Sequence, residues 1–159
     1  MGRGGLMLLW RLSIEQFASN FDGGYGRFFD GRWNTIGHAV TYCASSPSLC
    51  VLEKLVHVQD PTILPDLVMV TYDVPERTKF SSIGLDELPE DWRRREGLTQ
   101  QRGDVWHGSR STLLLKVPSA IVPLKDSPDV NVMINHSHPR VTDIKIRSTE
   151  PFALDQRLL

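Results

Sequence analysis

The stretch Gly31 to His57 constrains the fold more than any other, because three kinds of local structure follow one another in it. Residues 31–37 hold two glycines that bracket an arginine, an indole and an amide, a composition typical of an ordered loop. Residues 39–43 are rich in β-branched and aromatic side chains and predict a short strand. Ser46 then suits the N-cap of a helix, and Pro47 suits its first position. The sequence therefore predicts a loop, a strand and a helix in direct succession.

The predicted helix carries one acidic residue beside its apolar face. Three apolar residues recur at helical spacing and predict that face: Leu49, Leu52 and Val56. Glu53 follows directly in the sequence and lies at the edge of the face. Two interpretations stand: a solvated glutamate or salt-bridge partner, and a partly desolvated acid pointing into a cleft beside Arg32 and Tyr42. The spacing does not decide between them.

Length and composition are those of an ordinary globular protein. The chain has 159 residues, which suits one domain, with 40% hydrophobic and 23% charged residues. A net charge of −1 gives no global field for nucleic acid or an anionic membrane, so direct binding to either is not expected. Two cysteines are too few for a disulfide framework, and the N-terminal apolar run is too short to span a bilayer. We expect a cytoplasmic protein.

The glycines at the start of the chain predict a boundary near Met7. We expect a flexible N-terminal extension over residues 1–6 and one domain over residues 7–159, with Met7 as a candidate alternative start. His136 and His138 stand at alternate positions without a nearby cysteine or acid pair, so no metal site is expected.

Short apolar runs predict several further strands, and one stretch predicts a second helix. The strands are expected at 7–13, 67–74, 113–117, 120–123, 130–135 and 141–147, and the helix at 99–111. The helices do not alternate regularly with the strands, which favours an α+β fold over a doubly wound sheet. The run Arg93-Arg94-Arg95 in the polar middle of the chain is interpreted as a solvated helix face.

One combination of residues suits the chemistry of a dinucleotide. Arg32, and Arg11 as a second candidate, could hold a pyrophosphate by bidentate contacts. Tyr42 offers a flat face for a planar heterocycle, and Glu53 could stabilise an oxocarbenium-like ribosyl centre. These parts suit cleavage of an N-glycosidic bond. No phosphate-binding or nucleophile-elbow motif points to another chemistry, and Ser119 on its own reads as a turn residue.

Ordered blocks at compatible spacings extend this pattern over nearly the whole chain: Trp10–Leu12, Gly31–Asn34 with Gly37, Tyr42, Leu52–His57, Gly103–Trp106, Val117–Pro123, Asn131–Asn135, His138–Pro139 and Phe152–Leu158. Together they resemble the RES-domain toxins of bacterial toxin–antitoxin pairs. That family is named for an arginine, a glutamate and a serine, which the resemblance places at Arg32, Glu53 and Ser119. It implies a single compact domain similar to ADP-ribosyltransferases, with a split, mostly antiparallel central sheet, that consumes NAD without a metal.

The resemblance also implies a role for each site residue. Arg32 would bind the pyrophosphate, Tyr42 would stack on nicotinamide, and Glu53 would stabilise the ribosyl cation. Ser119 would hydrogen-bond the nicotinamide side or hold Glu53. Four further residues complete the expected substrate-binding set: Arg11, Trp33, Asn34 and Asn135. The chain departs from the family pattern at two positions, where Asp30 replaces an expected glycine and His136 an expected proline.

Three functional hypotheses follow. The first is a bacteriostatic toxin that depletes NAD by cleaving the nicotinamide–ribose bond, as a glycohydrolase or a phosphorylase. The second is a protein ADP-ribosyltransferase that uses NAD as donor. The third is a non-catalytic NAD-sensing or partner-binding module, which would need no acid, so the presence of Glu53 argues against it.

The resemblance implies a cognate antitoxin with a helix-turn-helix DNA-binding portion, and we expect a possible homodimer within a larger assembly.

Overall fold

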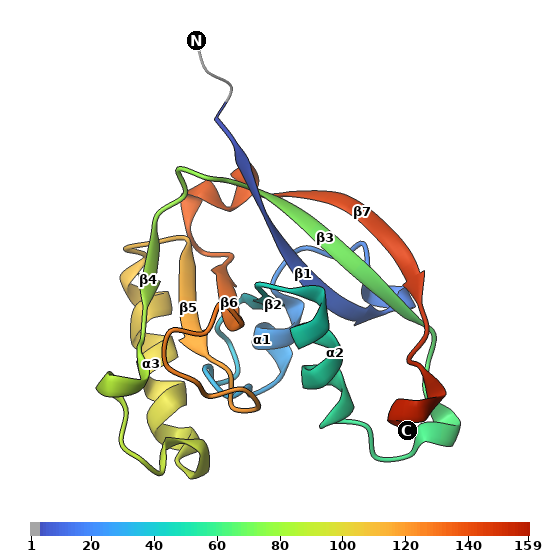
Figure 1. Ribbon diagram of the computed structural model, residues 1–159. Coiled ribbons are helices and arrows are strands. Elements are labelled where there is room, and N and C mark those ends of the chain that lie inside the picture. Colours follow the sequence, from blue (N-terminus) through green and yellow to red (C-terminus); the bar gives the residue numbers. More distant parts are fainter. Residues whose placement is uncertain (1–3) are drawn as a thin grey trace.

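The computed structural model describes residues 4–159, in which one mixed sheet of seven strands is flanked by helices (Figure 1). The strands are β1 (Leu6–Ile14), β2 (Val40–Ala44), β3 (Leu67–Pro75), β4 (Phe80–Ser82), β5 (Leu114–Pro118), β6 (Val130–Asn135) and β7 (Lys145–Phe152). The α-helices are α1 (Gly24–Phe28), α2 (Pro47–Leu55) and α3 (Glu96–Ser109). The strand order is β4-β5-β6-β2-β1-β3-β7, and every neighbouring pair is antiparallel except β4 with β5.

The sheet is split between β2 and β1. The two strands share a single paired position, Trp10 with Ala44, whereas β1 pairs with β3 along its whole length. Figure 1 shows that β1, β3 and β7 run in a different direction from β5 and β6. The structure therefore confirms the expected α+β domain with a split, mostly antiparallel central sheet.

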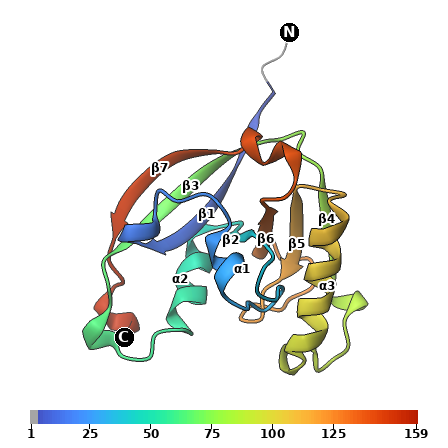
Figure 2. The ribbon, with the colours of Figure 1, turned by 180° about the vertical axis from the view of Figure 1, so that it is seen from behind.

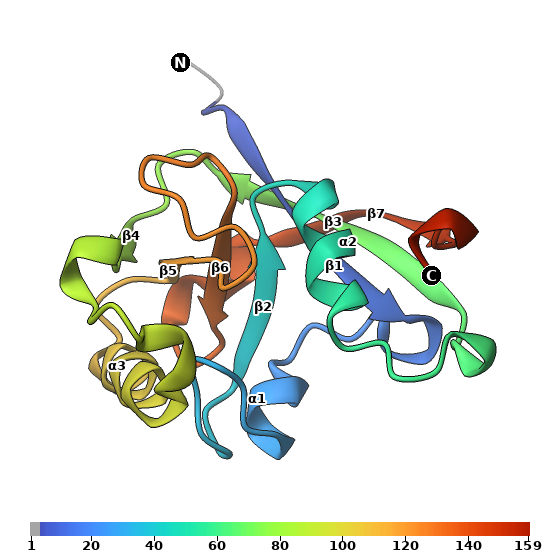
Figure 3. The same cartoon turned by 60° about the horizontal axis from the view of Figure 1, so that its bottom comes forward.

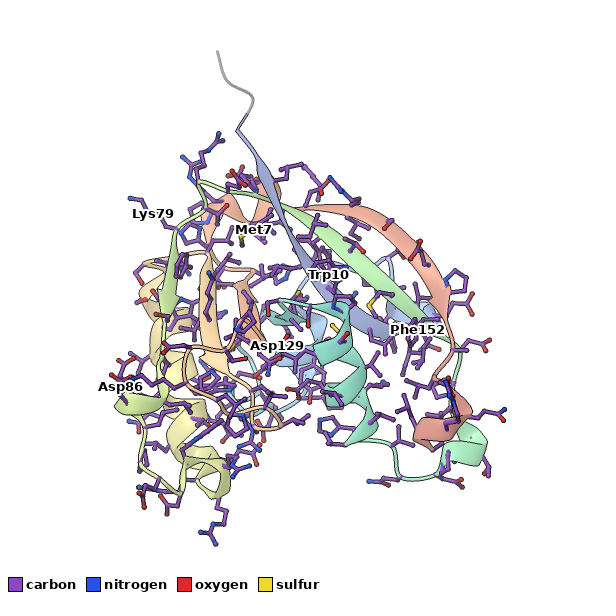
Figure 4. All side chains as sticks on the ribbon, in the orientation of Figure 1. Met7, Trp10, Lys79, Asp86, Asp129 and Phe152 are labelled. Atoms are coloured by element: carbon purple, nitrogen blue, oxygen red, sulfur yellow. The ribbon has the colours of Figure 1, made fainter. Side chains whose placement is uncertain are left out.

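Three apolar clusters fill the spaces that this arrangement creates. The first lies between the two halves of the sheet, where Cys43 and Ile134 meet Leu9 and Tyr72. The second covers the other face of β2, β6 and β5 and includes three buried tryptophans, Trp33, Trp92 and Trp106. The third lies under α2, where Leu49 and Cys50 pack with Ala44 and Met69. Trp10 lies on β1 beside α2 (Figure 4).

The start of α2 agrees with the sequence, but only Leu49 of its predicted buried face is buried, and the prediction is wrong for Leu52 and Val56. Ser46 is the N-cap, and its hydroxyl accepts a hydrogen bond from the Leu49 amide at 3.2 Å. Leu52 is 39% exposed and Val56 is 60% exposed, and the residues buried on α2 are Leu49 and Cys50. The rotation of the helix is set by packing on β1, where the Cys50 thiol contacts the Trp10 carbonyl at 3.1 Å. Glu53 follows Leu49 by one turn, so it lies on the inward side of the helix and not at its edge.

Other local differences have identifiable causes. Residues 120–123 form no strand, because the Ser119 hydroxyl accepts the backbone N–H groups of Ile121 and Val122 and bends the chain there. Residues Pro139–Asp143 form a 3₁₀ turn, so the last strand begins only at Lys145. The short edge strand β4 and the five-residue helix α1 carried too little periodicity to be recognised.

At the N-terminus β1 begins at Leu6. Residues 1–3 of the expected flexible extension lie outside the described part of the chain, and the domain boundary at Met7 stays a prediction. Across residues 4–159, no helix is both long and apolar enough to cross a bilayer.

Candidate active site

Residues 31–37, called here the arginine loop, are held by side chains of α3. The Thr99 hydroxyl donates a hydrogen bond to the Arg32 carbonyl at 2.5 Å, and the Gln100 amide donates to the Gly31 carbonyl at 2.9 Å. Thr99 is fully buried, so its hydroxyl cannot exchange this partner for water. Both contacts are made to backbone carbonyls, so they fix the loop at Arg32 independently of the conformation of its side chain.

The next turn of α3 extends the same attachment. Asp104 accepts hydrogen bonds from the backbone N–H of Thr35 at 3.0 Å and from its hydroxyl at 2.6 Å. Gly103 lies against the Trp33 carbonyl so closely that a Cβ at this position would overlap the carbonyl oxygen. A glycine is therefore required there for steric reasons, and the arginine loop packs directly on the helix backbone.

The Arg32 side chain extends from this fixed backbone across a tryptophan. Its guanidinium lies 5.8 Å from the centre of the Trp92 ring, and its Nη1 donates to the Arg93 carbonyl at 3.2 Å. Within residues 4–159 this is the single hydrogen bond that the guanidinium donates. Because arginine has five N–H donors in a planar fork, most of them remain to contact an anion.

Tyr42 is fixed by its hydroxyl. The hydroxyl donates to Asn34 Oδ1 at 2.6 Å and accepts from the Trp33 amide at 3.1 Å. Burial is the main cause that raises the Tyr42 pKa well above its usual value of 10.0, so the phenol stays neutral. A Cβ on Gly31 would lie 2.5 Å from the tyrosine oxygen, so this loop position has no room for a side chain. Tyr42 is thus unsuited to acid–base chemistry, and stacking of its ring on a ligand stays a prediction.

The Glu53 carboxylate is held through one of its two oxygens. Ser119 Oγ donates to Glu53 Oε1 at 3.0 Å, and Asn131 Nδ2 donates to the same oxygen at 2.8 Å. Ser119 is fully buried, and its oxygen accepts two backbone N–H groups, so its proton is directed at Glu53. This is one of the two contacts expected for Ser119, and the other, with nicotinamide, stays a prediction. Oε2 receives no hydrogen bond from residues 4–159.

The strand register brings Tyr42 and Glu53 to the same face of the sheet. Tyr42 pairs with Met133, and Ala44 pairs with Asn131, so Tyr42 and Asn131 lie on one face of neighbouring strands. Asn131 in turn binds Glu53. Figure 3 shows β2 between α2 on one side and the loop that leads to α3 on the other. The arginine loop contacts Tyr42 through the Trp33 amide and Asn34 Oδ1, and Glu53 of α2 contacts Asn131, so both border this face of β2 and β6.

Arg11 is not brought together with these residues. Its neighbours Trp10 and Leu12 pack towards α2, so strand alternation places Arg11 on the opposite face of β1. Its Nε donates to the Tyr72 hydroxyl at 2.9 Å, and its Nη2 lies within 3.2–3.4 Å of three carbonyl oxygens of residues 17–20. The short helix and loop that follow β1 are seen on that side in Figure 2. These contacts anchor the segment after β1, and a role for Arg11 at the pyrophosphate stays a prediction.

Three other expected substrate-binding residues are buried, and two of them, Asn34 and Asn135, donate hydrogen bonds within the chain. The Asn34 amide donates to the carbonyls of Phe29 and Thr35 at 3.0 and 3.1 Å. The Asn135 amide donates to the His107 carbonyl at 2.9 Å. Trp33 is 1% exposed and lies within the second apolar cluster, which contains the three buried tryptophans and is called here the tryptophan cluster. Direct substrate contacts by these three residues stay predictions.

The two departures from the family pattern lie in different places. Asp30 Oδ1 accepts the Ile36 amide at 2.8 Å and so closes the arginine loop. His136 contacts the Thr41 hydroxyl at 2.7 Å, on the face of β2 opposite Tyr42. Burial is the main cause that lowers the pKa of His136 to about 4.

The site contains two supporting residues that the sequence did not single out. Asn131 interrupts an apolar strand run, Val130-Asn131-Val132, and a polar residue inside such a run is a signal that can be read from sequence. Thr99 carried no such signal, because a threonine in a polar helix is unremarkable until the helix is placed against the loop. Within residues 4–159, no group of three histidine, cysteine, aspartate or glutamate residues is arranged to hold a metal ion.

A family model described as "RES domain" matches residues 8–155. The chain belongs to the RES domain family. A relative from Photorhabdus laumondii named "Toxin Res" is 34% identical over 96% of this chain and 97% of its own length. A relative from Sphingobium named "Prs ADP-ribosylating toxin" is 31% identical over 94% of this chain and 95% of its own length.

Among solved structures, a chain of the M. tuberculosis MbcT–MbcA toxin–antitoxin complex superposes with a TM-score of 0.68. The alignment covers 94% of this chain and 86% of that chain at 16% sequence identity. At this identity the match shows a shared fold.

Proposed function

We propose that this RES-domain protein is a toxin that breaks the nicotinamide–ribose bond of NAD. The observation that carries the proposal is the Glu53 carboxylate, which faces the sheet from α2 and is fixed through Oε1 by Ser119 and Asn131. The names of relatives support it, because two that span nearly the whole chain are called toxins and one of these is called ADP-ribosylating.

The geometry of Glu53 suits a dissociative cleavage. Departure of nicotinamide leaves positive charge on the ribosyl ring, and a fixed carboxylate stabilises that charge without reorganising. Two donors hold Oε1, so Oε2 is the oxygen left to face the ribose or to orient the incoming nucleophile. Ser119 and Asn131 act as positioning residues for this carboxylate.

The arginine loop and β2 supply binding in this proposal. Arg32 contacts the pyrophosphate through its unused N–H groups, and the Tyr42 ring stacks on the nicotinamide. Asn34 and Trp33 fix the Tyr42 hydroxyl, so they act on the substrate through Tyr42. Asn135 supports the end of β6, and Arg11 remains a second candidate for the arginine.

The acceptor of the ADP-ribosyl group distinguishes the leading proposal from its alternative. Transfer to water or phosphate makes the protein a glycohydrolase or a phosphorylase. Transfer to a protein side chain makes it an ADP-ribosyltransferase, which the name of the Sphingobium relative favours. A non-catalytic NAD-binding module would have no use for the fixed carboxylate at Glu53.

Product analysis tests these possibilities together. The purified protein is incubated with NAD, with and without phosphate, and the products are identified by mass. Free nicotinamide with ADP-ribose indicates hydrolysis, and ADP-ribose 1″-phosphate indicates phosphorolysis. Nicotinamide release only when a cell extract is added, with a mass increase on an extract protein, indicates transfer. Intact NAD under all conditions contradicts the proposal.

A cognate antitoxin is part of the proposal. The structural neighbour is described as a toxin–antitoxin complex, and an NAD-consuming enzyme requires control in the cell that makes it. We expect the antitoxin to combine a helix-turn-helix DNA-binding portion with a segment that covers the surface around Arg32 and Glu53. Expression of this chain alone should arrest growth and lower cellular NAD, and co-expression of the neighbouring gene should restore both. Harmless expression of the active, folded chain contradicts control by an antitoxin.

A further inference from the structure

We propose that Arg93 joins Arg32 as a second arginine that binds the pyrophosphate of the dinucleotide. This inference rests on the proposed use of NAD and adds a residue that the sequence alone assigned to a solvated helix face. It is carried by the contacts that link Arg93 to both parts of the candidate site.

The first link runs from Arg93 to the arginine loop. Arg32 Nη1 donates to the Arg93 carbonyl at 3.2 Å, and the Arg32 guanidinium lies over the ring of the adjacent residue, Trp92. Trp92 is 4% exposed and packs in the tryptophan cluster, so the 3₁₀ turn Trp92–Arg94 is anchored at this point. The backbone that carries Arg93 is therefore fixed next to the Arg32 guanidinium.

The second link runs from Arg93 to the segment that holds the carboxylate. Arg93 Nη1 donates to the Ala120 carbonyl at 3.3 Å, and Ala120 directly follows the serine that binds Glu53. The Arg93 side chain thus spans from the arginine loop towards Ser119. Its side chain is exposed, and within residues 4–159 its guanidinium donates this one hydrogen bond.

The three consecutive arginines differ in their surroundings. Arg95 lies 3.9 Å from Asp91 in an exposed ion pair, and Arg94 is exposed on the same turn. Arg93 is the member of the triplet whose guanidinium contacts the site segment. A pyrophosphate carries two negative charges, and two planar guanidinium groups on adjacent backbone match it better than one.

The test compares Arg93→Ala with Arg94→Ala, a neighbour of the same type and exposure. Binding is measured by calorimetry for NAD, for ADP-ribose and for nicotinamide riboside, which lacks the pyrophosphate. Arg93→Ala should weaken NAD and ADP-ribose binding by about tenfold, the loss typical of one charged hydrogen bond, and leave the riboside unchanged. Arg93→Lys should recover little of the loss, because lysine lacks the planar fork, and Arg94→Ala should bind like the parent.

The inference is overturned if Arg93→Ala binds NAD as well as Arg94→Ala does. It is also overturned if Arg93→Ala loses as much affinity for the riboside as for NAD. Measurements of binding and of nicotinamide release by the parent protein distinguish a failure of this inference from a failure of the proposed reaction. If the parent binds ADP-ribose but releases no nicotinamide from NAD, the proposed reaction fails, whereas an Arg93-dependent loss of ADP-ribose binding still supports the second arginine. If the parent binds neither NAD nor ADP-ribose, both fail.

Discussion

The arginine loop and the Glu53 carboxylate belong to one surface but are fixed in different ways. The loop is held through its backbone, by Thr99, Gln100 and Asp104 of a helix that is distant in sequence. The carboxylate is held through its side chain, by a serine and an asparagine where β5 ends and β6 begins. The backbone attachment leaves the Arg32 side chain adaptable for binding, whereas the side-chain attachment fixes one oxygen for chemistry. We therefore propose that the loop serves binding and the carboxylate serves catalysis.

The largest effect is expected from Glu53→Gln, which keeps shape and loses charge. Turnover of NAD should fall by about 100-fold or more, equivalent to about 3 kcal/mol of transition-state stabilisation. The control is Glu90→Gln, an exposed glutamate of the same length, which should turn over NAD like the parent. Near-normal turnover in Glu53→Gln, with folding confirmed by circular dichroism, removes Glu53 from the mechanism.

The stability of the fold should depend on pH through His136, which lies on the face of β2 opposite Tyr42. Burial lowers the pKa of His136 to about 4 from a usual value of 6.5, so between these values the unfolded chain binds more protons than the folded one. Stability should be complete above pH 6.5 and fall as the pH drops towards 4, by about 3 kcal/mol from this group.

Urea unfolding at pH 7 and at pH 4.5 measures this contribution. His136→Gln should lose less stability between the two values than the parent, because glutamine does not titrate. An equal loss in both proteins would show that His136 does not cause the acid sensitivity. The result also shows whether a pH–rate profile reports on catalysis or on folding.

The binding role of the loop is tested by Arg32→Lys and Arg32→Ala. Lysine keeps the charge but lacks the planar fork, so both variants should raise the KM for NAD by roughly 10-fold to 100-fold, the loss of one or two charged hydrogen bonds. The kcat should change much less than in Glu53→Gln. Full binding by Arg32→Lys would mean that Arg32 supplies only general charge.

The attachment of the loop to α3 is tested by two alanine substitutions in one helix. Gly103→Ala forces a methyl group against the Trp33 carbonyl and should destabilise the fold by about 1–3 kcal/mol, and it should also raise the KM for NAD. Gly108→Ala meets nothing within 4 Å and should stabilise the helix by about 0.5–1 kcal/mol. Thermal unfolding measures both, and equal effects would argue against close packing at Gly103.

The sequence predicted the parts of this site that depend on local pattern. The loop, strand and helix over Gly31–His57 follow from glycine placement, β-branched residues and an N-cap. Side-chain chemistry singled out Arg32 and Glu53, the resemblance to the RES family added Ser119, and the structure places Ser119 against Glu53. The split sheet was likewise implied by the resemblance before it was observed.

The remaining features depend on packing between distant segments. The rotation of α2 could not be read from its apolar spacing, because contact with β1 turned Cys50 inward and left Leu52 exposed. Thr99, which holds the arginine loop, is 67 positions away from Arg32 in the sequence. The role that we propose for Arg93 depends on its contact with Ala120, which the sequence does not indicate. Such contacts are set by the fold and leave no periodic signal.

Calorimetric binding of NAD to Glu53→Gln tests most directly the division between a binding loop and a catalytic carboxylate. The account predicts that this variant binds NAD with a Kd within about threefold of the parent, a difference below 1 kcal/mol, while turnover falls by about 100-fold or more. Loss of binding in parallel with turnover would contradict the division, because Glu53 would then act in ground-state binding and not in the chemical step.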